Sequence, residues 1–333
     1  MSISIYDIAK KADVAPSTVS RALQDHPRIG AETKARILTL AKEMGYIPST
    51  IAKSLSANQT WTIGMVTASI SDPFTGRVIE GVEQVALEAG YNVLLSTSQG
   101  DSQRELAVME VLQQRRVDGI IGIASHLLNQ YRRYLDRIQL PILMINEQEP
   151  GGAIHSVAVD DVHGARLAVD HLISLGHRRI GYVSVPDRPK SNRLRWQGYQ
   201  AALQAAGIPV DEVLLFTADA IEDHVKHGQA SLQRLLAAGA TAVFCYNDAV
   251  AIGLLAACHE QGLSLPKDLS VAGFDDIDMA TYTFPPLTTI RQPRFELGRQ
   301  AMLMMLELLD GQRPENRILH GELVVRQTTA SII

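Results

Sequence analysis

Side chains that could bind a small molecule lie where strand-like runs of the chain end or where a helical stretch begins. They include carboxylates, amides, guanidinium groups and an aromatic ring, in Ser71-Asp72-Pro73-Phe74, Asn146, Asn247-Asp248, Asp275-Asp276, Arg193 and Arg195. Structural alternatives stay open, because Asn247 and Asp275 can cap the element that follows and Arg195 can pair with a nearby carboxylate.

The motifs of common enzyme active sites are absent from the sequence. It has no phosphate-binding glycine loop, no G-x-G-x-x-G and no H-E-x-x-H, and its ten histidines are scattered. No His, Ser and Asp grouping suggests a catalytic triad. The sequence therefore predicts a binding module and not an enzyme, with no catalytic residue, metal ligand or cofactor.

The elements that must position these side chains follow an alternating α/β pattern from Trp61 onward. Apolar runs that alternate with amphipathic helical stretches are typical of parallel sheets covered on both faces. The expected strands are 63–67, 92–96, 119–123, 142–145, 180–184, 213–216, 242–245, 270–274, 287–291 and 323–326, and the expected helices are 75–89, 102–115, 192–206, 223–237, 248–261 and 295–310. This set suits two doubly wound sheets, and ligands of such sheets bind beyond the carboxyl ends of the strands.

The first sixty residues carry a second candidate site, one for a polyanion. Their pattern predicts three short helices, over 5–12, 16–24 and 31–44. The three-residue turn between the first two is typical of a helix-turn-helix. On the second predicted helix, Ser17, Ser20, Arg21 and Gln24 share a polar face. That face can enter a DNA major groove, where Arg21 can reach guanine O6 and N7, or it can be a solvated face of a helical bundle.

The charge distribution favours the DNA interpretation. Residues 1–60 hold eight Lys or Arg and five acidic residues. The rest of the chain has more acidic than basic residues, so that the formal net charge of the whole chain is −5. A basic head on an acidic body suits a DNA-binding module joined to another domain. After it, residues 49–57 predict one or two helical turns capped by Ser49. So short a helix is unstable alone, so we expect it to fold only against a partner.

The bulk composition is that of an ordinary globular protein, with 46% hydrophobic and 20% charged residues. No apolar run approaches the roughly 18–20 residues that span a bilayer, and the N-terminus lacks the pattern of a secretory signal. Cys245 and Cys258 lie in apolar surroundings that are typical of buried free thiols. We therefore expect a cytoplasmic protein that makes no membrane contact.

Short motifs follow one another along nearly the whole chain in an order that is specific to one family. The head contains Tyr6-Asp-Ile-Ala, Ala12-Asp-Val-Ala-Pro-Ser-Thr-Val-Ser-Arg21, Gly45-Tyr-Ile-Pro48 and Ala52-Lys-Ser-Leu55. The body contains Asp161-Val-His-Gly, Leu175-Gly-His-Arg-Arg-Ile180, Arg193-Leu-Arg-Trp-Gln-Gly-Tyr199, Asn247-Asp248, Gly273-Phe-Asp-Asp276 and Pro286-Leu-Thr-Thr-Ile290. The sequence resembles the lactose/galactose-repressor (LacI/GalR) family of transcription regulators.

The resemblance implies DNA contacts at particular positions of this head. It assigns base contacts to Pro16, Ser17 and Arg21 and backbone or positioning contacts to Tyr6, Thr18 and Ser20. It also implies a hinge helix that contacts DNA through Ser49, Ala52 and Leu55, with Leu55 as an apolar wedge in the minor groove. Ser49 departs from the pattern, since many members have Asn there, but serine also caps a helix well.

The resemblance also implies a periplasmic-binding-protein-like core that holds an effector between two lobes. It places the site at six of the side chains above, Asp72, Phe74, Asn146, Arg195, Asn247 and Asp275, although Asn146 stands where the pattern usually has Asp. Such polar groups around one cleft suit a ligand with many hydroxyl groups, and Phe74 can stack on the apolar face of a sugar. The domains then comprise a helix-turn-helix head at 1–48, a hinge at 49–60 and a core at 61–333, with a first lobe of 61–160 plus 291–320 and a second of 161–290 plus 321–330. No leucine-heptad segment follows the core, so a homodimer is expected.

These patterns predict a repressor that binds near-palindromic operator DNA and is controlled allosterically by a small sugar. A purine or a phosphosugar is the alternative effector. A solute-binding protein with the same two lobes is a further alternative, but it would lack residues 1–57.

Overall fold

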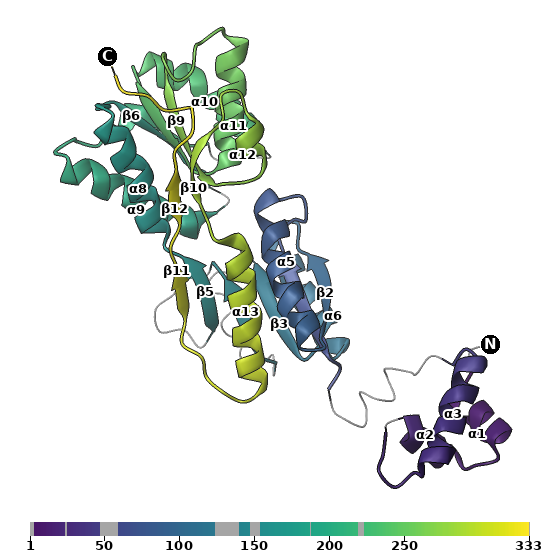
Figure 1. Cartoon of the computed structure of the whole chain (residues 1–333). Helices are drawn as coiled ribbons and strands as arrows, with labels where there is room; N and C mark the ends of the chain where they lie inside the picture. The colour runs from purple at the N-terminus through teal and green to yellow at the C-terminus, as the bar shows by residue number, and fades with distance from the viewer. Residues whose placement is uncertain are drawn as a thin grey trace. The chain divides into compact units, whose positions relative to one another are not determined.

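The computed structural model describes residues 3–23, 25–46, 59–123, 140–146, 154–186, 188–218 and 223–332 (Figure 1). Contacts divide the chain into two compact units, Met1–Thr60 and Trp61–Ile333. No helix among the described residues is long and apolar enough to cross a membrane.

The head is a bundle of three short helices: α1 (Ile5–Ala12), α2 (Pro16–Leu23) and α3 (Ala31–Glu43). Asp13 adopts a left-handed conformation with φ of 52° and ends α1, which opens the turn toward α2. Ile8, Val19 and Ile37 are fully buried, one from each helix. This small core holds the first two helices in the arrangement that the helix-turn-helix pattern predicts.

The first lobe of the second unit is a parallel sheet in the order β11-β5-β4-β3-β1-β2. Its strands are β1 (Thr62–Thr67), β2 (Asn92–Thr97), β3 (Gly119–Ile123), β4 (Ile142–Ile145), β5 (His155–Val159) and β11 (Arg317–Leu319). Helices α5 (Pro73–Glu88) and α13 (Arg294–Leu309) lie side by side over it (Figure 1). Helix α6 (Ser102–Gln114) packs through Met109 and Leu112 in a separate apolar cluster. Helices on both faces explain why β3 is buried along its whole length.

The second lobe repeats this plan with the strand order β12-β10-β9-β8-β6-β7. Its strands are β6 (Ile180–Val183), β7 (Leu215–Phe216), β8 (Ala242–Cys245), β9 (Ser270–Asp275), β10 (Thr288–Arg291) and β12 (Glu322–Val324), of which β12 runs antiparallel to β10. Helices α8 (Asp161–Ser174) and α9 (Pro189–Ala205) cover one face, and α10 (His224–Ala237) and α11 (Asp248–Glu260) cover the other. The helix α12 (Met279–Tyr282) and the 3-10 turn η2 (Glu212–Leu214) complete this lobe.

The chain crosses between the lobes three times, after β5, after β10 and between β11 and β12. The second crossover brings Gln292 and Pro293 between β10 and the start of α13. Because β10 pairs with β9 in parallel, with Arg291 opposite Asp275, the residues after both strands lie at one edge of the sheet. Of the candidate binding residues, Asn247 and Asp275 lie at the carboxyl edge of this sheet, whereas Asp72, Phe74 and Asn146 belong to the first lobe.

Candidate DNA-binding and effector sites

The second helix of the head carries Ser17, Ser20 and Arg21 of the predicted polar face, and Gln24, the fourth member, lies outside the described residues. Ser17 and Arg21 are exposed, whereas Val19 and Ala22 on the same helix are buried. Pro16, Thr18 and Ser20 are half-buried on α2, and Tyr6 on α1 is exposed. The predicted hinge contacts Ser49, Ala52 and Leu55 lie outside the described residues, so their roles stay predictions.

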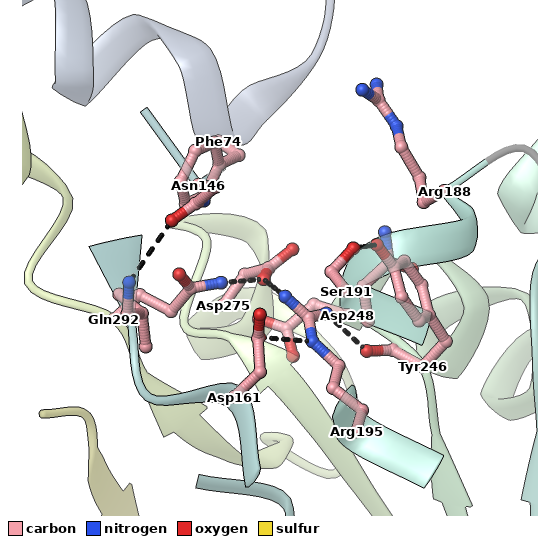
Figure 2. Close-up of polar contacts among 12 residues, drawn as sticks. Phe74, Asn146, Asp161, Arg188, Ser191, Arg195, Tyr246, Asp248, Asp275 and Gln292 are labelled. Atoms are coloured by element: carbon pink, nitrogen blue, oxygen red, sulfur yellow. Dashed lines mark hydrogen bonds and ion pairs between the residues drawn. The ribbon is translucent and has the colours of Figure 1, made fainter. Parts of the chain in front are cut away.

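A buried arginine organises the second lobe's side of the effector site. Arg195, in the second turn of α9, is 4% exposed and donates Nε–H to Asp161 Oδ1 at 2.8 Å and Nη1–H to the Tyr246 carbonyl at 2.7 Å (Figure 2). Its Nη2 lies 3.7 Å from Asp275 Oδ1. The guanidinium also stacks 3.8 Å from the centroid of the Phe274 ring. Arg195 therefore forms the carboxylate pair that the sequence left open for it, and its contact with an effector stays a prediction.

The electrostatics of this cluster keep Arg195 charged. Burial alone would lower the pKa of Arg195, but Asp161, Tyr246 and Asp275 around it raise that pKa above its usual value. For Asp275, burial has a larger effect on the pKa than the neighbouring charges have. Burial raises the pKa of the Asp275 carboxyl to about 6, although Arg195 acts in the other direction. At neutral pH, Asp275 is mostly an ionised acceptor beside a fixed positive charge.

Asp275 is held at the end of β9 by a strained turn. Its φ is 122°, and the φ of Asp276 is 53°, in a region that non-glycine residues seldom occupy. Two buried hydrogen bonds of Asp248 hold the residue after this turn in place. Asp248 accepts from the Ile277 N–H at 2.9 Å, and it is itself held against β10 because it also accepts from Thr289 Oγ1 at 2.5 Å. Burial raises the pKa of the Asp248 carboxyl well above its ordinary value. The arrangement directs the Asp275 side chain at the sheet edge.

Gln292 is a member of the cluster that the sequence analysis missed. It is 3% exposed, and its Nε2–H donates to Asp275 Oδ1 at 2.6 Å (Figure 2). Its other amide atom, Oε1, is buried and accepts no hydrogen bond from the described residues. A buried acceptor without a donor is costly and uncommon in proteins, so this atom marks a place for a ligand donor. The signal in the sequence was its position directly after the expected strand 287–291.

Asn247 takes the structural role that the sequence left open for it. Its Oδ1 accepts from the Val250 N–H at 3.0 Å and caps α11, and its Nδ2 lies 2.9 Å from His224 Nδ1. The amide is half-buried, and a contact with an effector stays a prediction. Beside it, Ser191 Oγ lies 2.7 Å from the Tyr246 hydroxyl, so these two hydroxyl groups also face one another near Arg195 (Figure 2).

The first lobe contributes Asp72, Phe74 and Asn146. Asp72 caps α5 by accepting from the Phe74 N–H at 3.0 Å, and its Oδ2 lies 3.4 Å from Arg188 Nη2 on the second lobe. Phe74 is 7% exposed and packs into the first-lobe core. Asn146 has φ of 62°, and its Oδ1 accepts from the Val159 N–H at 3.2 Å. Figure 2 shows Phe74 and Asn146 beside Gln292 and Asp275.

Carboxylate, guanidinium and amide groups from both lobes therefore lie around one edge, with fixed positive charge at Arg195 and an open acceptor at Gln292. No group of three or more His, Cys, Asp or Glu in the described part of the chain is placed to hold a metal ion. The arrangement can form hydrogen bonds with a polar ligand.

A helix-turn-helix head joined to a two-lobed α/β core defines a class of DNA-binding transcription regulators. Two family models match the chain: bacterial regulatory proteins of the lacI family over residues 4–49, and the periplasmic binding protein-like domain over residues 169–329. The chain belongs to the lacI family of bacterial regulatory proteins.

Relatives of known name match almost the full length. The chain is 35% identical to the HTH-type transcriptional repressor CytR of Escherichia coli (strain K12), over 98% of this chain and 96% of that protein. It is 34% identical to the ribose operon repressor of the same organism, over 90% of this chain and 91% of the relative.

Solved structures agree with the fold throughout. The Lac repressor dimer bound to operator and the anti-inducer ONPF is 28% identical, with a TM-score of 0.90 over 99% of this chain and all of that one. A LacI family regulator from Enterococcus faecium with bound ribose is 31% identical, with a TM-score of 0.73 over 82% of this chain and all of that one. This chain is accordingly a DNA-binding transcription regulator with a Lac repressor-like fold.

Proposed function

We propose that the chain is a transcriptional repressor whose operator affinity changes when a small hydroxyl-rich sugar binds between the two lobes. The observation that carries this proposal is the buried set of Arg195, Asp275 and Gln292 at the carboxyl edge of the second sheet. Arg195 is a fixed donor, Asp275 a fixed acceptor, and Gln292 Oε1 an acceptor that awaits a donor. Adjacent hydroxyl groups of a sugar donate and accept at once, which suits this arrangement.

The known chemistry of similar proteins supports a sugar. The Enterococcus faecium relative holds ribose, and a transcriptional regulator of similar fold, 26% identical over 98% of this chain, is a complex of CelR with cellobiose. A purine and a phosphosugar remain outcomes of the test below, because each also carries hydrogen-bond donors and acceptors.

On the DNA side, the proposed regulator is a homodimer whose heads bind two halves of a near-palindromic operator. Arg21 and Ser17 contact bases, Pro16 adjoins them at the helix start, and Tyr6, Thr18 and Ser20 contact the backbone. The hinge at 49–57 folds against DNA, and Leu55 enters the minor groove. The protein acts in the cytoplasm, where its operator lies, and performs no catalysis, since its relatives are regulators.

A two-stage experiment tests this function. A thermal-shift screen across sugars, phosphosugars and purines first identifies the effector, and titration calorimetry confirms its affinity. Fluorescence anisotropy with a selected operator then measures operator affinity with and without it. Asp275→Asn should weaken effector binding at least about tenfold because it removes an ionic acceptor, whereas Asn at the exposed position Asp310 should not. If no compound of these classes shifts the wild-type protein, the effector proposal is wrong.

A further inference from the structure

Asp276 follows the proposed effector contact Asp275. Its carboxylate oxygens and its backbone carbonyl all accept hydrogen bonds from arginine side chains. Its carboxylate accepts from Arg326 Nη2 at 2.6 Å and from Arg291 Nε at 2.6 Å. Its backbone carbonyl accepts from Arg294 Nη2 at 2.7 Å. Because the φ of Asp276 is 53°, the turn needs such support to keep this conformation.

Of these arginines, Arg294 is the one that also reaches the other lobe. It is 8% exposed, and while Nη2 binds the Asp276 carbonyl on the second lobe, Nη1 donates to the Pro73 carbonyl of the first lobe at 3.0 Å. Pro73 lies between the proposed effector contacts Asp72 and Phe74. One rigid guanidinium therefore joins the backbone next to Asp275 to the backbone next to Asp72 and Phe74.

The elements around Arg294 leave little freedom for slippage. Arg294 is the first residue of α13, which packs against α5 with almost no gap between the helices: a Cβ at Gly298 would overlap the Val78 carbonyl oxygen, and one at Gly81 would overlap that of Phe295. Figure 1 shows the two helices side by side. Because α5 and α13 are packed so closely, a displacement of the Asp276 carbonyl moves both helices together through Arg294, and the Arg294 side chain cannot simply shift by itself.

A second contact between the lobes is weaker. Arg188 Nη2 lies 3.4 Å from Asp72 Oδ2, and the Asp72 side chain is about one-third exposed. Solvent screens such a pair, whereas Arg294 is itself buried, and its two partly buried hydrogen bonds go to backbone carbonyls. Among these bridges, Arg294 is the one suited to transmit a change of position.

We propose that Arg294 is a positioning residue that couples effector binding at Asp275 to the orientation of the first lobe. The inference rests on the proposed function, since it takes Asp275 as an effector contact. A ligand that draws Asp275 toward the first lobe also moves Asp276, and Arg294 carries that shift to the start of α5. The first lobe is continuous in sequence with the linker to the DNA-binding head, so its orientation is what operator affinity can depend on.

A cavity of about 440 Å³ beside Arg294 supplies a matched control. Both Arg294 and Arg77 line it, together with Thr281, Pro293 and Glu296. Arg77 lies on α5 as well, but it is exposed and pairs with Glu80 on its own helix at 2.7 Å. The charge of Arg77 also interacts with Asp278 of the second lobe, but its close partner is Glu80. Removal of Arg77 therefore removes a guanidinium from the same cavity but removes neither of the hydrogen bonds by which Arg294 joins the lobes.

The first arm of the test needs no effector. Hydrogen–deuterium exchange is measured on the full-length apo forms of wild type, Arg294→Met, Arg294→Lys and Arg77→Met. We expect faster exchange in Arg294→Met at both 72–80 and 274–282, a smaller increase in Arg294→Lys, which can donate to one carbonyl, and none in Arg77→Met. Unchanged exchange in Arg294→Met would overturn the bridge.

The second arm measures coupling as the ratio of operator affinities with and without saturating effector. Effector couplings in such proteins are typically about 5- to 150-fold. Arg294→Met should still bind effector by calorimetry but reduce this ratio to less than about threefold, whereas Arg77→Met should keep the wild-type ratio. A wild-type ratio in effector-saturated Arg294→Met would overturn the inference. A wild-type protein that answers no compound would instead refute the proposed effector, and the exchange result would still decide the bridge.

Discussion

Gln292 donates its amide N–H to Asp275 Oδ1 across 2.6 Å, and this bond leaves the Gln292 carbonyl oxygen buried with no donor among the described residues. Asp275 is the last residue of β9 and Gln292 is the residue after β10, and these neighbouring parallel strands end at one sheet edge. Asp275 thus lies between Arg195 and Gln292. The acceptor that has no donor among the described residues is Oε1 of Gln292. A ligand hydroxyl that donates to Gln292 Oε1 completes this hydrogen-bond network.

Gln292→Met should weaken effector binding by about 1–3 kcal/mol, because it removes the acceptor and keeps the side-chain length. The unfolding free energy should change little. The variant loses the bond to Asp275 but also removes an acceptor that has no donor, and these two effects oppose each other. Calorimetry and thermal melts measure the two quantities. Gln312→Met, at an exposed position, is the control, and equal effector affinity in both variants would contradict the role of Gln292.

Effector affinity should fall at acidic pH because of Asp275. Its pKa of about 6 means that the carboxyl is ionised at pH 7.5 and mostly protonated at pH 5. A protonated carboxyl accepts fewer hydrogen bonds, so affinity should drop by up to about tenfold per pH unit below 6. Calorimetry from pH 5 to pH 8 measures the profile. The profile of Asp275→Asn should be flat over that range, and a pH-dependent profile in that variant would assign the effect to another group.

The same group affects stability in the opposite direction. Because burial raises the folded-state pKa of Asp275 above the ordinary value of 3.8, the folded chain binds this proton more tightly than the unfolded chain does. The resulting stabilisation is complete below pH 3.8 and is lost as pH rises through about 6. Asp275→Asn should therefore stabilise the effector-free protein more at pH 7.5 than at pH 5, which thermal melts at the two pH values measure.

Arg195→Ala should destabilise the core as well as alter effector binding. The substitution leaves Asp161 as a buried carboxylate without its partner and removes the contacts with Phe274 and Tyr246. Breaking a buried ion pair in this way costs about 3–5 kcal/mol. Urea unfolding, followed by the fluorescence of the half-buried Trp196, measures the loss. Arg193→Ala, at an exposed position on the same helix, should stay within about 0.5 kcal/mol of wild type.

Apolar runs gave most of the fold from sequence. Gly119–Ile123 and Ala242–Cys245 have the bounds expected of them, because strands buried on both faces carry uninterrupted apolar residues. The strand β5 and the helix α8 were missed. His155 and Ser156 interrupt the apolar run of β5, and α8 follows at once, with Asp160 as its cap and no turn residues before it. The strand β11 was missed because its three residues are too few to show the alternation of apolar and polar side chains that identifies a strand.

The expected strand 213–216 was wrong in its first half. Asp211 accepts from the Val213 N–H at 3.2 Å and starts the turn η2, so only Leu215 and Phe216 pair with β6. The hydrogen bond from the Val213 N–H to the Asp211 side chain forms a turn here, in place of the strand pairing that apolar residues such as Val213 favour.

The site was predictable where function follows strand ends and was missed where it depends on pairing between strands. Asp275 and Asn247 follow strands in sequence and could be found by that rule. Gln292 also follows an expected strand, but its contact with Asp275 depends on the pairing of β10 with β9, a long-range register that a local pattern does not contain. The capping role of Asn247 and the pairing of Arg195 with Asp161 likewise depend on tertiary packing, which is why the sequence left both alternatives open.

The last prediction concerns DNA recognition by Arg21. It is exposed on α2 opposite the buried Val19 and Ala22, so Arg21→Ala should leave the thermal stability of the protein unchanged. Operator affinity should fall by about 1–3 kcal/mol, with relaxed preference at one guanine in each half-site, because a guanidinium bonds O6 and N7 of guanine together.

Fluorescence anisotropy with the selected operator and with single-base variants measures both effects at one salt concentration. Arg28→Ala is the control, because Arg28 is an exposed cation in the loop between α2 and α3. Its loss should weaken binding to all sequences alike and leave the base preference intact, since a cation away from the recognition helix acts through phosphate charge. An Arg21→Ala protein that behaves like Arg28→Ala would place base recognition elsewhere on the head.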